Sequence, residues 1–228
     1  MKLKAVDISR TASASAIVFD VLRKAIIEGE IKAGEPLRQD EIARLFNTSR
    51  IPVREAISRL EEQGLVKTQR YKGAVVAGLS ASEAAEVFDL RALLEPQIIR
   101  DAVPRMSREC LSRAREHCMA FSGSADPMRW GDLNRTFHQT LYSASVLKYF
   151  IEVADNAMDR VERYIRAQLV MSNGMARAGR EHLEILEACE AGDADRAGEL
   201  LRAHILGAKL SLLECFPQVA DPAPPARG

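Results

Sequence analysis

The chain has 228 residues, of which 47% are hydrophobic and 5% aromatic, so composition favours a folded, mainly helical protein with one large or two small domains. Its zero net charge is uneven, because residues 1–80 carry 14 Lys/Arg against 10 Asp/Glu and residues 81–228 carry 18 against 22. The opening MKLKAVDISR lacks an apolar core and no apolar run approaches the roughly 18 residues of a membrane span, so we expect neither a signal peptide nor a membrane partner.

Three helices are predicted within the first 63 residues. Residues 15–28 repeat apolar side chains at helical spacing, namely Ile17, Val18, Val21, Leu22, Ala25 and Ile26. A turn rich in Gly and Pro leads to a short helix over residues 39–46. Ser49 is a suitable N-cap for a third helix over residues 50–63, in which Pro52 is tolerated in the first turn. Gly64 is expected to end this helix.

A β-hairpin is predicted directly after the third helix. Val66, Thr68, Val75 and Val76 favour strands, and residues 71–73 supply a turn. Three short helices followed by a hairpin are typical of a winged helix-turn-helix. We therefore expect residues 1–80 to form a DNA-binding domain, consistent with their excess of positive charge.

The third predicted helix has the two faces of a recognition helix. Arg50, Arg54 and Ser58 share one face, and the other is apolar, with Val53, Ala56, Ile57 and Leu60. Arginines at the start of such a helix reach base edges in the major groove. Cations in the hairpin can hold phosphates, namely Lys67, Arg70 and Lys72. A lone arginine pair could equally be a solvated surface, but here the helix, the hairpin and the charge excess coincide.

This region resembles the GntR family of regulators. The matching stretch is NTSRIPVREAISRLEEQGLVKTQRYKGAVV, which follows the pattern S-R-x-P-V-R-E-A-L, R-L-x-x-x-G-L-V and a wing glycine. The resemblance implies a homodimer on double-stranded DNA with a pseudo-palindromic operator. Arg50 and Arg54 would contact bases with Ser49 and Ser58 beside them, and Gly73 and Lys72 would approach the backbone. Some members carry an arginine where this chain has Asp40, so Arg38 or Arg44 is expected to serve instead.

Residues 81–216 are predicted to form an all-α antiparallel helical bundle, which makes the whole protein mainly α. Ser80 or Ser82 caps its first helix, and breaks near residues 104–107, 122–127, 143–146, 172–174 and 191–193 divide it into six helices. Residues 217–228, rich in Pro and Ala, are expected to be a disordered tail. Four cysteines without C-x-x-C spacing fit reduced, mostly buried thiols in a cytoplasmic protein, namely Cys110, Cys118, Cys189 and Cys215.

Three of the four histidines lie on apolar helix faces. His182 and His204 are almost equally distant from a turn near residues 192–193, so an antiparallel pair of helices brings them to one level. His138 follows Asn134 by four residues, on one helix face. These four residues are a candidate site for a divalent transition metal. The alternative is that each histidine is a hydrogen-bonded core residue, which is our interpretation of His117.

The second domain resembles the FadR C-terminal (FCD) domain of GntR regulators, and its six helices place it nearer the VanR-like branch. The segments that carry the likeness are EVFDLRALLEPQIIRDAV, LNRTFHQTLYSAS and GREHLEILEACEAGDADRAGELLRAHI. Metal-binding members use an Asp and three His, and Asn134 replaces that Asp here, with Zn or Ni as the expected ion. The resemblance implies a small carboxylate effector, for which Arg91 is a candidate, weighed evenly against an Arg91–Glu95 ion pair. Expected effector contacts are Arg91, Asn134, His138, Tyr142, His182 and His204.

The function expected from the sequence is a ligand-responsive transcriptional regulator, a repressor that a carboxylic acid releases from DNA. It is not expected to be an enzyme. Two alternatives stay open at this point. One is a ligand-independent DNA-binding dimer whose second domain is only structural, and the other is a metal-dependent hydrolase.

Overall fold

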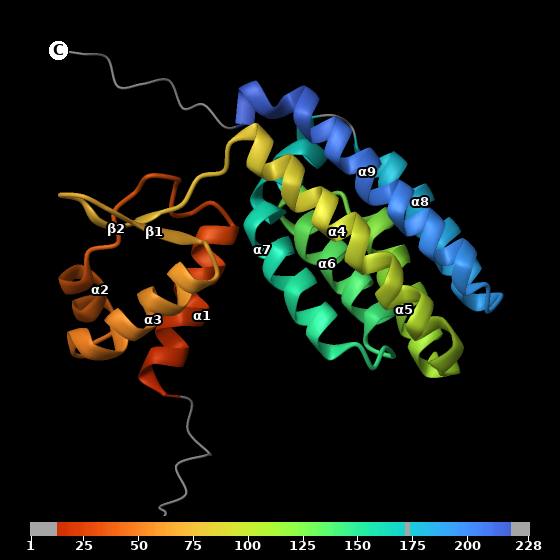
Figure 1. Cartoon of the computed structure of the whole chain (residues 1–228), viewed down its shortest axis with the longest axis horizontal. Helices are drawn as coiled ribbons and strands as arrows, with labels where there is room; N and C mark the ends of the chain where they lie inside the picture. The colour runs from red at the N-terminus through yellow and green to blue at the C-terminus, as the bar shows by residue number, and fades with distance from the viewer. Residues whose placement is uncertain (1–12, 172–173, 220–228) are drawn as a thin grey trace, which may run out of the picture. The chain divides into compact units, whose positions relative to one another are not determined.

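A computed structural model describes residues 13–171 and 174–219 of the chain (Figure 1). The chain divides into two compact units between Gly78 and Leu79, slightly before the boundary expected at residue 80. The first unit combines helices with a hairpin, and the second contains helices but no strand among its described residues.

The first unit contains three helices and a two-stranded antiparallel sheet. The helices are α1 (Ala14–Ile27), α2 (Gln39–Leu45) and α3 (Arg50–Glu62), and the strands are β1 (Val66–Gln69) and β2 (Gly73–Val76). Val66 pairs with Val76 and Gln69 with Gly73, and Pro36 forms an isolated bridge to Val75. The order of elements confirms the predicted winged helix-turn-helix, with the hairpin as its wing.

The core of this unit lies between α1 and α3. All four residues of the apolar stripe predicted for α3 are buried. In α1 the buried face differs from the prediction, because Ile17 and Val21 are about half exposed (49% and 48%) while Phe19 and Ile27 are buried. The predicted apolar residues cover too wide an arc of α1 for all of them to face α3. Leu45, at the end of α2, is 80% exposed although it is apolar.

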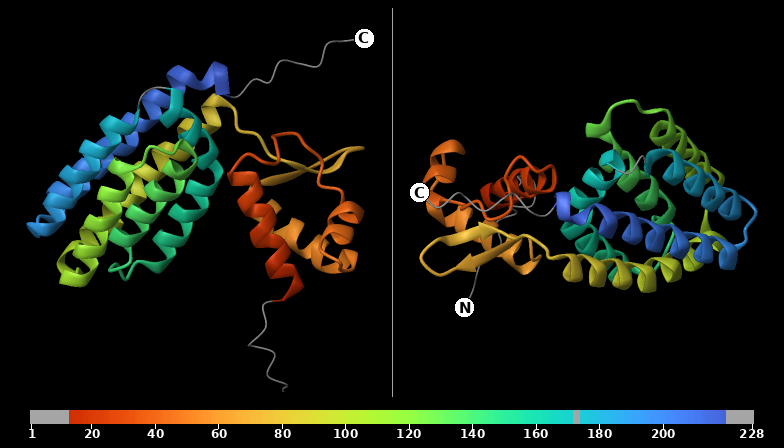
Figure 2. Two further views of the ribbon diagram at one scale, coloured as in Figure 1. Left: turned by 180° about the vertical axis from the view of Figure 1, so that it is seen from behind. Right: turned by 90° about the horizontal axis from the view of Figure 1, so that it is seen from above.

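The second unit is a bundle of six α-helices and one short 3-10 turn among the described residues. In chain order these are α4 (Ala81–Ala102), η1 (Val103–Arg105), α5 (Arg108–Gly123), α6 (Pro127–Tyr142), α7 (Lys148–Met171), α8 (Gly174–Glu190) and α9 (Ala194–Val219). Figures 1 and 2 show α4 side by side with α9, and α4 also packs on α7. α5 packs on α6 and α8. The predicted helical bundle is therefore confirmed.

Local sequence explains how helices in this unit begin and reverse. Ser80 begins α4 with a capping box, since its hydroxyl oxygen accepts from the Glu83 N–H and the Glu83 carboxylate accepts from the Ser80 N–H at 2.8 Å. At the turn between α8 and α9, Gly192 takes a φ of 73°, a conformation that suits glycine. This tight reversal lets α8 and α9 pack against each other, which positions His182 and His204.

The C-terminal helix corrects one prediction. α9 continues to Val219, so residues 217–219 of the expected disordered tail are helical, and residues 220–228 lie outside the described residues. The preceding residues are good helix formers, and extending an existing helix is far easier than starting one. Within the described part of the chain, no helix has both the length and the hydropathy to cross a bilayer.

Candidate functional site

The turn between α2 and α3 places the first turn of α3 at the protein surface. Asn47 adopts a left-handed φ of 48°, which asparagine tolerates better than most residues. Ser49 occupies the predicted N-cap position with extended backbone and is exposed, but its side chain forms no capping hydrogen bond. The position of Ser49 as the N-cap of α3 is therefore confirmed, and its place beside the DNA stays a prediction.

The exposed face of α3 carries Arg50, Arg54 and Ser58 at four-residue spacing. Arg50 forms an ion pair through Nε with the carboxylate of Asp40, in the first turn of α2. Arg54 forms neither an ion pair nor a hydrogen bond with other described side chains. Arg50 lies in the first turn of α3, where a cation interacts unfavourably with the helix dipole, so the stability of α3 does not explain this arginine.

The two arginines expected to assist, Arg38 at the N-cap of α2 and Arg44 within it, are both exposed and engaged at the surface. An Arg38 Nη1 donates to Glu41 Oε1 at 3.1 Å, and Arg44 Nε donates to the carbonyl oxygen of Asp40 at 3.2 Å. Exposed contacts of this kind contribute little free energy. Either guanidinium can therefore turn toward a phosphate at small cost.

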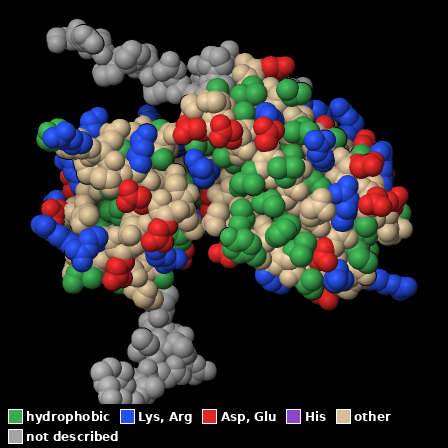
Figure 3. All heavy atoms as spheres, in the orientation of Figure 1, with side chains coloured by type: hydrophobic (Ala, Val, Ile, Leu, Met, Phe, Trp, Pro, Cys, Tyr) green, Lys and Arg blue, Asp and Glu red, His purple; other side chains and the backbone are tan. Residues whose placement is uncertain are grey.

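The tip of the hairpin is positively charged and strained. Lys72 is exposed, and Gly73 has a φ of 72° with open space where a side chain would begin. Tyr71 also has a left-handed φ of 66° and is 91% exposed, with the Arg70 guanidinium 4.9 Å from its ring. The sequence indicated only a turn at Tyr71; a strained, exposed aromatic at a wing tip is a feature that the structure adds. Figure 3 shows Lys and Arg side chains at this tip and over the α2–α3 region.

In the second unit, three helices bring three imidazoles together. His138 comes from α6, His182 from α8 and His204 from α9, and one candidate ligand atom of each lies within 4.8 Å of the others. All three are buried, with exposed fractions of 4%, 0% and 7%. The rings of His182 and His204 lie 4.8 Å apart, as their equal distance from the α8–α9 turn predicts. We call His138, His182 and His204 the histidine cluster.

The histidine cluster contains polar atoms that the described residues leave unsatisfied. Neither ring nitrogen of His182 has a hydrogen-bond partner, and His138 Nε2 has none. The His182 ring instead packs between Phe121 and Phe137, at centroid distances of 4.7 and 4.5 Å. Burial, followed by the charge of nearby His204, holds the pKa of His138 and His182 well below the ordinary value. Both imidazoles are therefore neutral and offer lone pairs.

Glu181 orients the third imidazole. Its Oε2 accepts a hydrogen bond from His204 Nδ1 at 2.7 Å, which leaves Nε2 of His204 as the nitrogen available to an ion. A carboxylate behind a ligating histidine is the usual way in which proteins fix the tautomer and orientation of the ring. In the sequence Glu181 is visible only as part of a motif, because nothing in the spacing predicts that its carboxylate reaches His204, 23 residues further along the chain.

Arg91 is buried and engaged by Glu95. Arg91 Nε donates to Glu95 Oε1 at 2.6 Å, and the Tyr142 hydroxyl donates to Glu95 Oε2 at 2.5 Å. The same hydroxyl lies 3.3 Å from His138 Nδ1. Burial and the Glu95 carboxylate raise the pKa of Tyr142 well above its ordinary value, so it stays a donor. Of the two roles weighed for Arg91, the ion pair is thus present in this structure.

Two small cavities flank the histidine cluster, and Arg91 lines both. Tyr142 and His138 line one, whereas Asn134 and His204 line the other. Each has a volume of about 20 Å³, which holds a single water or ion. The structure therefore brings all six expected effector contacts to one region, and an organic acid can enter it only if side chains move.

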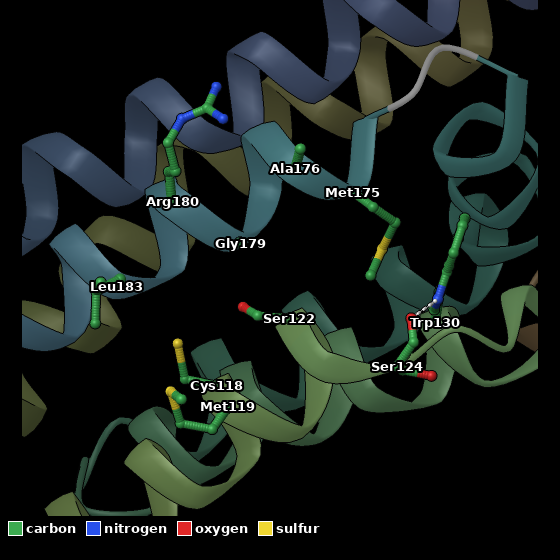
Figure 4. A pocket seen from close by; sticks show the side chains of 10 residues that line it. All are labelled: Cys118, Met119, Ser122, Ser124, Trp130, Met175, Ala176, Gly179, Arg180 and Leu183. Atoms are coloured by element: carbon green, nitrogen blue, oxygen red, sulfur yellow. Dashed lines mark hydrogen bonds between the residues drawn. The ribbon is translucent and has the colours of Figure 1, made fainter.

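A roomier cleft of about 520 Å³ opens between α5 and α8, away from these residues (Figure 4). Its walls are mostly apolar, with Met119, Trp130 and Met175 among them, and the Trp130 indole donates to the Ser124 carbonyl at 2.9 Å. The charged lining residue, Arg180, points away from the centre of the cleft in Figure 4. None of the expected effector contacts lines it.

The remaining histidine and the cysteines behave as structural residues. His117 Nδ1 lies 2.9 Å from Thr140 Oγ1, outside the histidine cluster. All four cysteines are free thiols, of which Cys118 and Cys189 are buried and the other two partly buried. Burial raises the pKa of Cys189 to about 12, which makes it a poor nucleophile.

Comparison with known proteins finds a matching protein family for each of the two units. Residues 14–76 match the gntR family of bacterial regulatory proteins, and residues 86–207 match the FCD domain. The HTH-type transcriptional regulator BphR of Paraburkholderia xenovorans (strain LB400) is 29% identical over 88% of this chain and 85% of its own length. The HTH-type transcriptional repressor GlaR of Escherichia coli (strain K12) is 27% identical over 81% and 89%. The structure of E. coli McbR/YncC shares the fold, with a TM-score of 0.80 over 90% of this chain and 100% of that one at 18% identity.

Proposed function

Because this chain belongs to the GntR family of bacterial regulatory proteins and carries an FCD domain, it is a DNA-binding transcriptional regulator, and we propose that it is a homodimeric repressor that a small carboxylic acid releases from DNA. We further propose that the FCD domain holds a divalent transition metal. The observation that carries the sensing half is the buried histidine cluster, with three ring nitrogens that have no hydrogen-bond partner among the described residues.

The DNA-binding half of the proposal uses the exposed face of α3 and the wing. Arg50 and Arg54 read base edges in the major groove, where arginine can donate two hydrogen bonds to one guanine. Ser49 and Ser58 lie on the same surface, and Lys72 with Gly73 approaches the DNA backbone at the wing. Arg38 and Arg44 add phosphate contacts. Two such domains on a pseudo-palindromic operator require a homodimer with fixed half-site spacing.

Exposed leucines support the proposed dimer. Leu90 and Leu93 on α4 and Leu210 on the adjacent α9 are 40%, 67% and 63% exposed. Figure 3 shows hydrophobic side chains gathered on this part of the second unit.

Relatives support the repressor role, since GlaR is described as a repressor.

The histidine cluster supports a metal site by its chemistry. Neutral imidazoles are good ligands for Zn or Ni, and His138, His182 and His204 would hold the ion, with the amide oxygen of Asn134 in place of the carboxylate seen in other members. Glu181 already fixes the orientation of His204. Without an ion, each unpartnered nitrogen costs about 1–3 kcal/mol of folding free energy. A bound ion with an open coordination position would supply a Lewis-acid site to which a carboxylate oxygen of the effector could bind.

The effector proposal rests on what surrounds the histidine cluster. Arg91 supplies a buried positive charge that lines both cavities, and Tyr142 supplies a hydroxyl donor. A carboxylic acid that enters must compete with Glu95 for Arg91, so its binding changes how α4 contacts α6. Because α4 is the first helix after the DNA-binding unit, such a change can shift the equilibrium between DNA-binding and released dimers. We place this chemistry in the cytoplasm and assign no enzymatic activity.

The test combines metal analysis, thermal stability and DNA binding on the full chain. Purified protein is stripped with a chelator and then titrated with Zn²⁺, Ni²⁺ and a panel of small carboxylic acids. We expect one metal to raise the unfolding midpoint, at least one acid to raise it further, and that acid to weaken DNA binding. His182→Ala should lose both responses but still bind DNA, whereas His117→Ala, outside the cluster, should keep them.

Two outcomes would favour the alternatives. If no metal and no acid changes the unfolding midpoint, the FCD domain is only structural and the protein is a ligand-independent regulator. If the metal-loaded protein hydrolyses simple esters and His182→Ala abolishes this activity, the protein is a metal-dependent hydrolase.

A further inference from the structure

One acidic side chain stands among the arginines of the helix-turn-helix. Asp40 lies in the first turn of α2, and its carboxylate forms an ion pair with Nε of Arg50, the first residue of α3. Its backbone carbonyl accepts a hydrogen bond from Arg44 Nε at 3.2 Å. One residue therefore contacts two of the arginines proposed to meet DNA.

The stability of the fold does not account for Asp40. The side chains of Asp40 and Arg50 are 59% and 70% exposed, and exposed ion pairs contribute at most about 1 kcal/mol to folding. An acidic residue in the first turn of a helix is favourable for the helix dipole, but Glu41 fills that role in the same turn. The core of the unit does not involve Asp40.

The approach to DNA does not account for Asp40 either. A carboxylate next to the recognition helix repels phosphates and removes one unit of the positive charge on which non-specific binding depends. Asp40 adds little stability and weakens the attraction to the DNA backbone, so its role must lie elsewhere. Its ion pair with Arg50 supplies that role.

Arg50 has four rotatable side-chain bonds and is mostly exposed, so on its own it would sample many orientations before binding. Readout of guanine by two parallel hydrogen bonds needs the guanidinium plane in one orientation. The contact with Asp40 engages Nε, which leaves both terminal Nη groups to donate to a base. Ordering the side chain in advance lowers the entropy cost of binding.

We propose that Asp40 is a positioning residue for base recognition, which acts by holding Arg50 in the orientation that reads one base pair. This proposal rests on the proposed entry of α3 into the major groove. It implies that Asp40 lowers affinity for DNA in general and raises affinity for the preferred sequence.

The experiment starts from the full chain and a pool of duplexes with a randomised central segment, from which the wild type selects its preferred duplex. Equilibrium affinities for that duplex and for a scrambled one are then measured for wild type, Asp40→Ala, Arg50→Ala and the double variant. The matched control is Glu41→Ala, which removes the same charge from the same helical turn without touching Arg50. Asp40→Asn keeps an acceptor oxygen but not the charge.

We expect Asp40→Ala to bind the scrambled duplex more tightly and the selected duplex more weakly, so that the ratio of the two affinities falls by up to about fivefold, the factor that corresponds to the loss of an exposed ion pair. Asp40→Ala and Arg50→Ala should lose preference at the same base pair, and the double variant should lose no more than Arg50→Ala. Glu41→Ala should tighten binding to both duplexes alike. Asp40→Asn should retain the preferred base pair with a reduced ratio.

Two results would overturn the proposal. If Asp40→Ala tightens binding to both duplexes by the same factor, Asp40 acts only as a charge. If Asp40→Ala and Arg50→Ala lose preference at different base pairs, Asp40 reads a base itself. A selection in which the wild type enriches no duplex, while still binding the pool, would instead remove the placement of α3 on which the proposal rests.

Discussion

Replacing His182 by leucine should stabilise the metal-free protein, although it alters a fully buried residue. His182 has two ring nitrogens without partners among the described residues, and each buried, unsatisfied nitrogen costs about 1–3 kcal/mol. Leucine has a similar volume and no polar atom. It loses the ring contacts with Phe121 and Phe137, worth about 0.5–1.5 kcal/mol each. We therefore expect His182→Leu to exceed the metal-free wild type by about 1–2 kcal/mol in unfolding free energy.

Adding metal should reverse that order. At a free metal concentration about a thousand times Kd, binding adds about 4 kcal/mol to the stability of the wild type and little to a variant that lacks a ligand. Denaturant unfolding of both proteins, in chelator and in excess Zn²⁺ or Ni²⁺, measures the two differences. His117→Leu is the control, since it removes a hydrogen-bonded imidazole and should destabilise the protein in both conditions. If His182→Leu is less stable than the wild type in chelator, the imidazole nitrogens are satisfied and the reasoning fails.

Three further predictions address other parts of the account. Arg54→Ala should cost about 1–3 kcal/mol of affinity for the selected duplex and relax its sequence preference, and unchanged preference in a repeated selection would remove Arg54 from base readout. Glu181→Gln should weaken metal binding about 10- to 100-fold by loosening His204, and calorimetric titration that finds an unchanged Kd would make Glu181 a surface residue only. In the folded protein the pKa of His138 and His182 lies below the ordinary value of 6.5. Below pH 6.5 the unfolded chain therefore binds more protons than the folded one. The metal-free protein should keep its full stability above pH 6.5 and lose stability below it, by at most about 1.4 kcal/mol per pH unit for each imidazole. Denaturant unfolding of chelator-treated protein across that range should show a shallower decline in His182→Leu, and equal slopes would contradict the lowered pKa of His182.

Most of the fold could be predicted from the sequence, because the spacing of apolar residues and the residues that begin or end helices and strands indicate the same elements. Helical spacing in α3, the strand-forming valines of the hairpin and a serine N-cap at Ser80 or Ser82 each predict the element that forms, and the structure selects Ser80. The errors occur where tertiary packing decides. Which arc of α1 is buried depends on where α3 lies, and the end of α9 depends on how far an established helix continues.

The histidine cluster could be predicted in part, because two of its members are related by a single tight turn. His182 and His204 lie at one level once α8 and α9 are antiparallel. The contacts that involve a third element could not be derived in this way. Neither the Asp40–Arg50 pair nor the Tyr142–Glu95 hydrogen bond follows from spacing along one helix, since each joins side chains whose separation is set by the packing of two helices.

The most direct test of the account measures whether the two units are linked. By thermodynamic reciprocity, an acid that weakens DNA binding must itself bind more weakly to the DNA-bound protein, by the same factor. The affinity of the acid found in the stability screen is therefore measured for the free metal-loaded protein and for the protein saturated with its selected duplex. We predict a lower affinity in the complex, by about 5- to 150-fold. Equal affinities in the two states would contradict the account, because the FCD domain would then bind its acid without any effect on DNA.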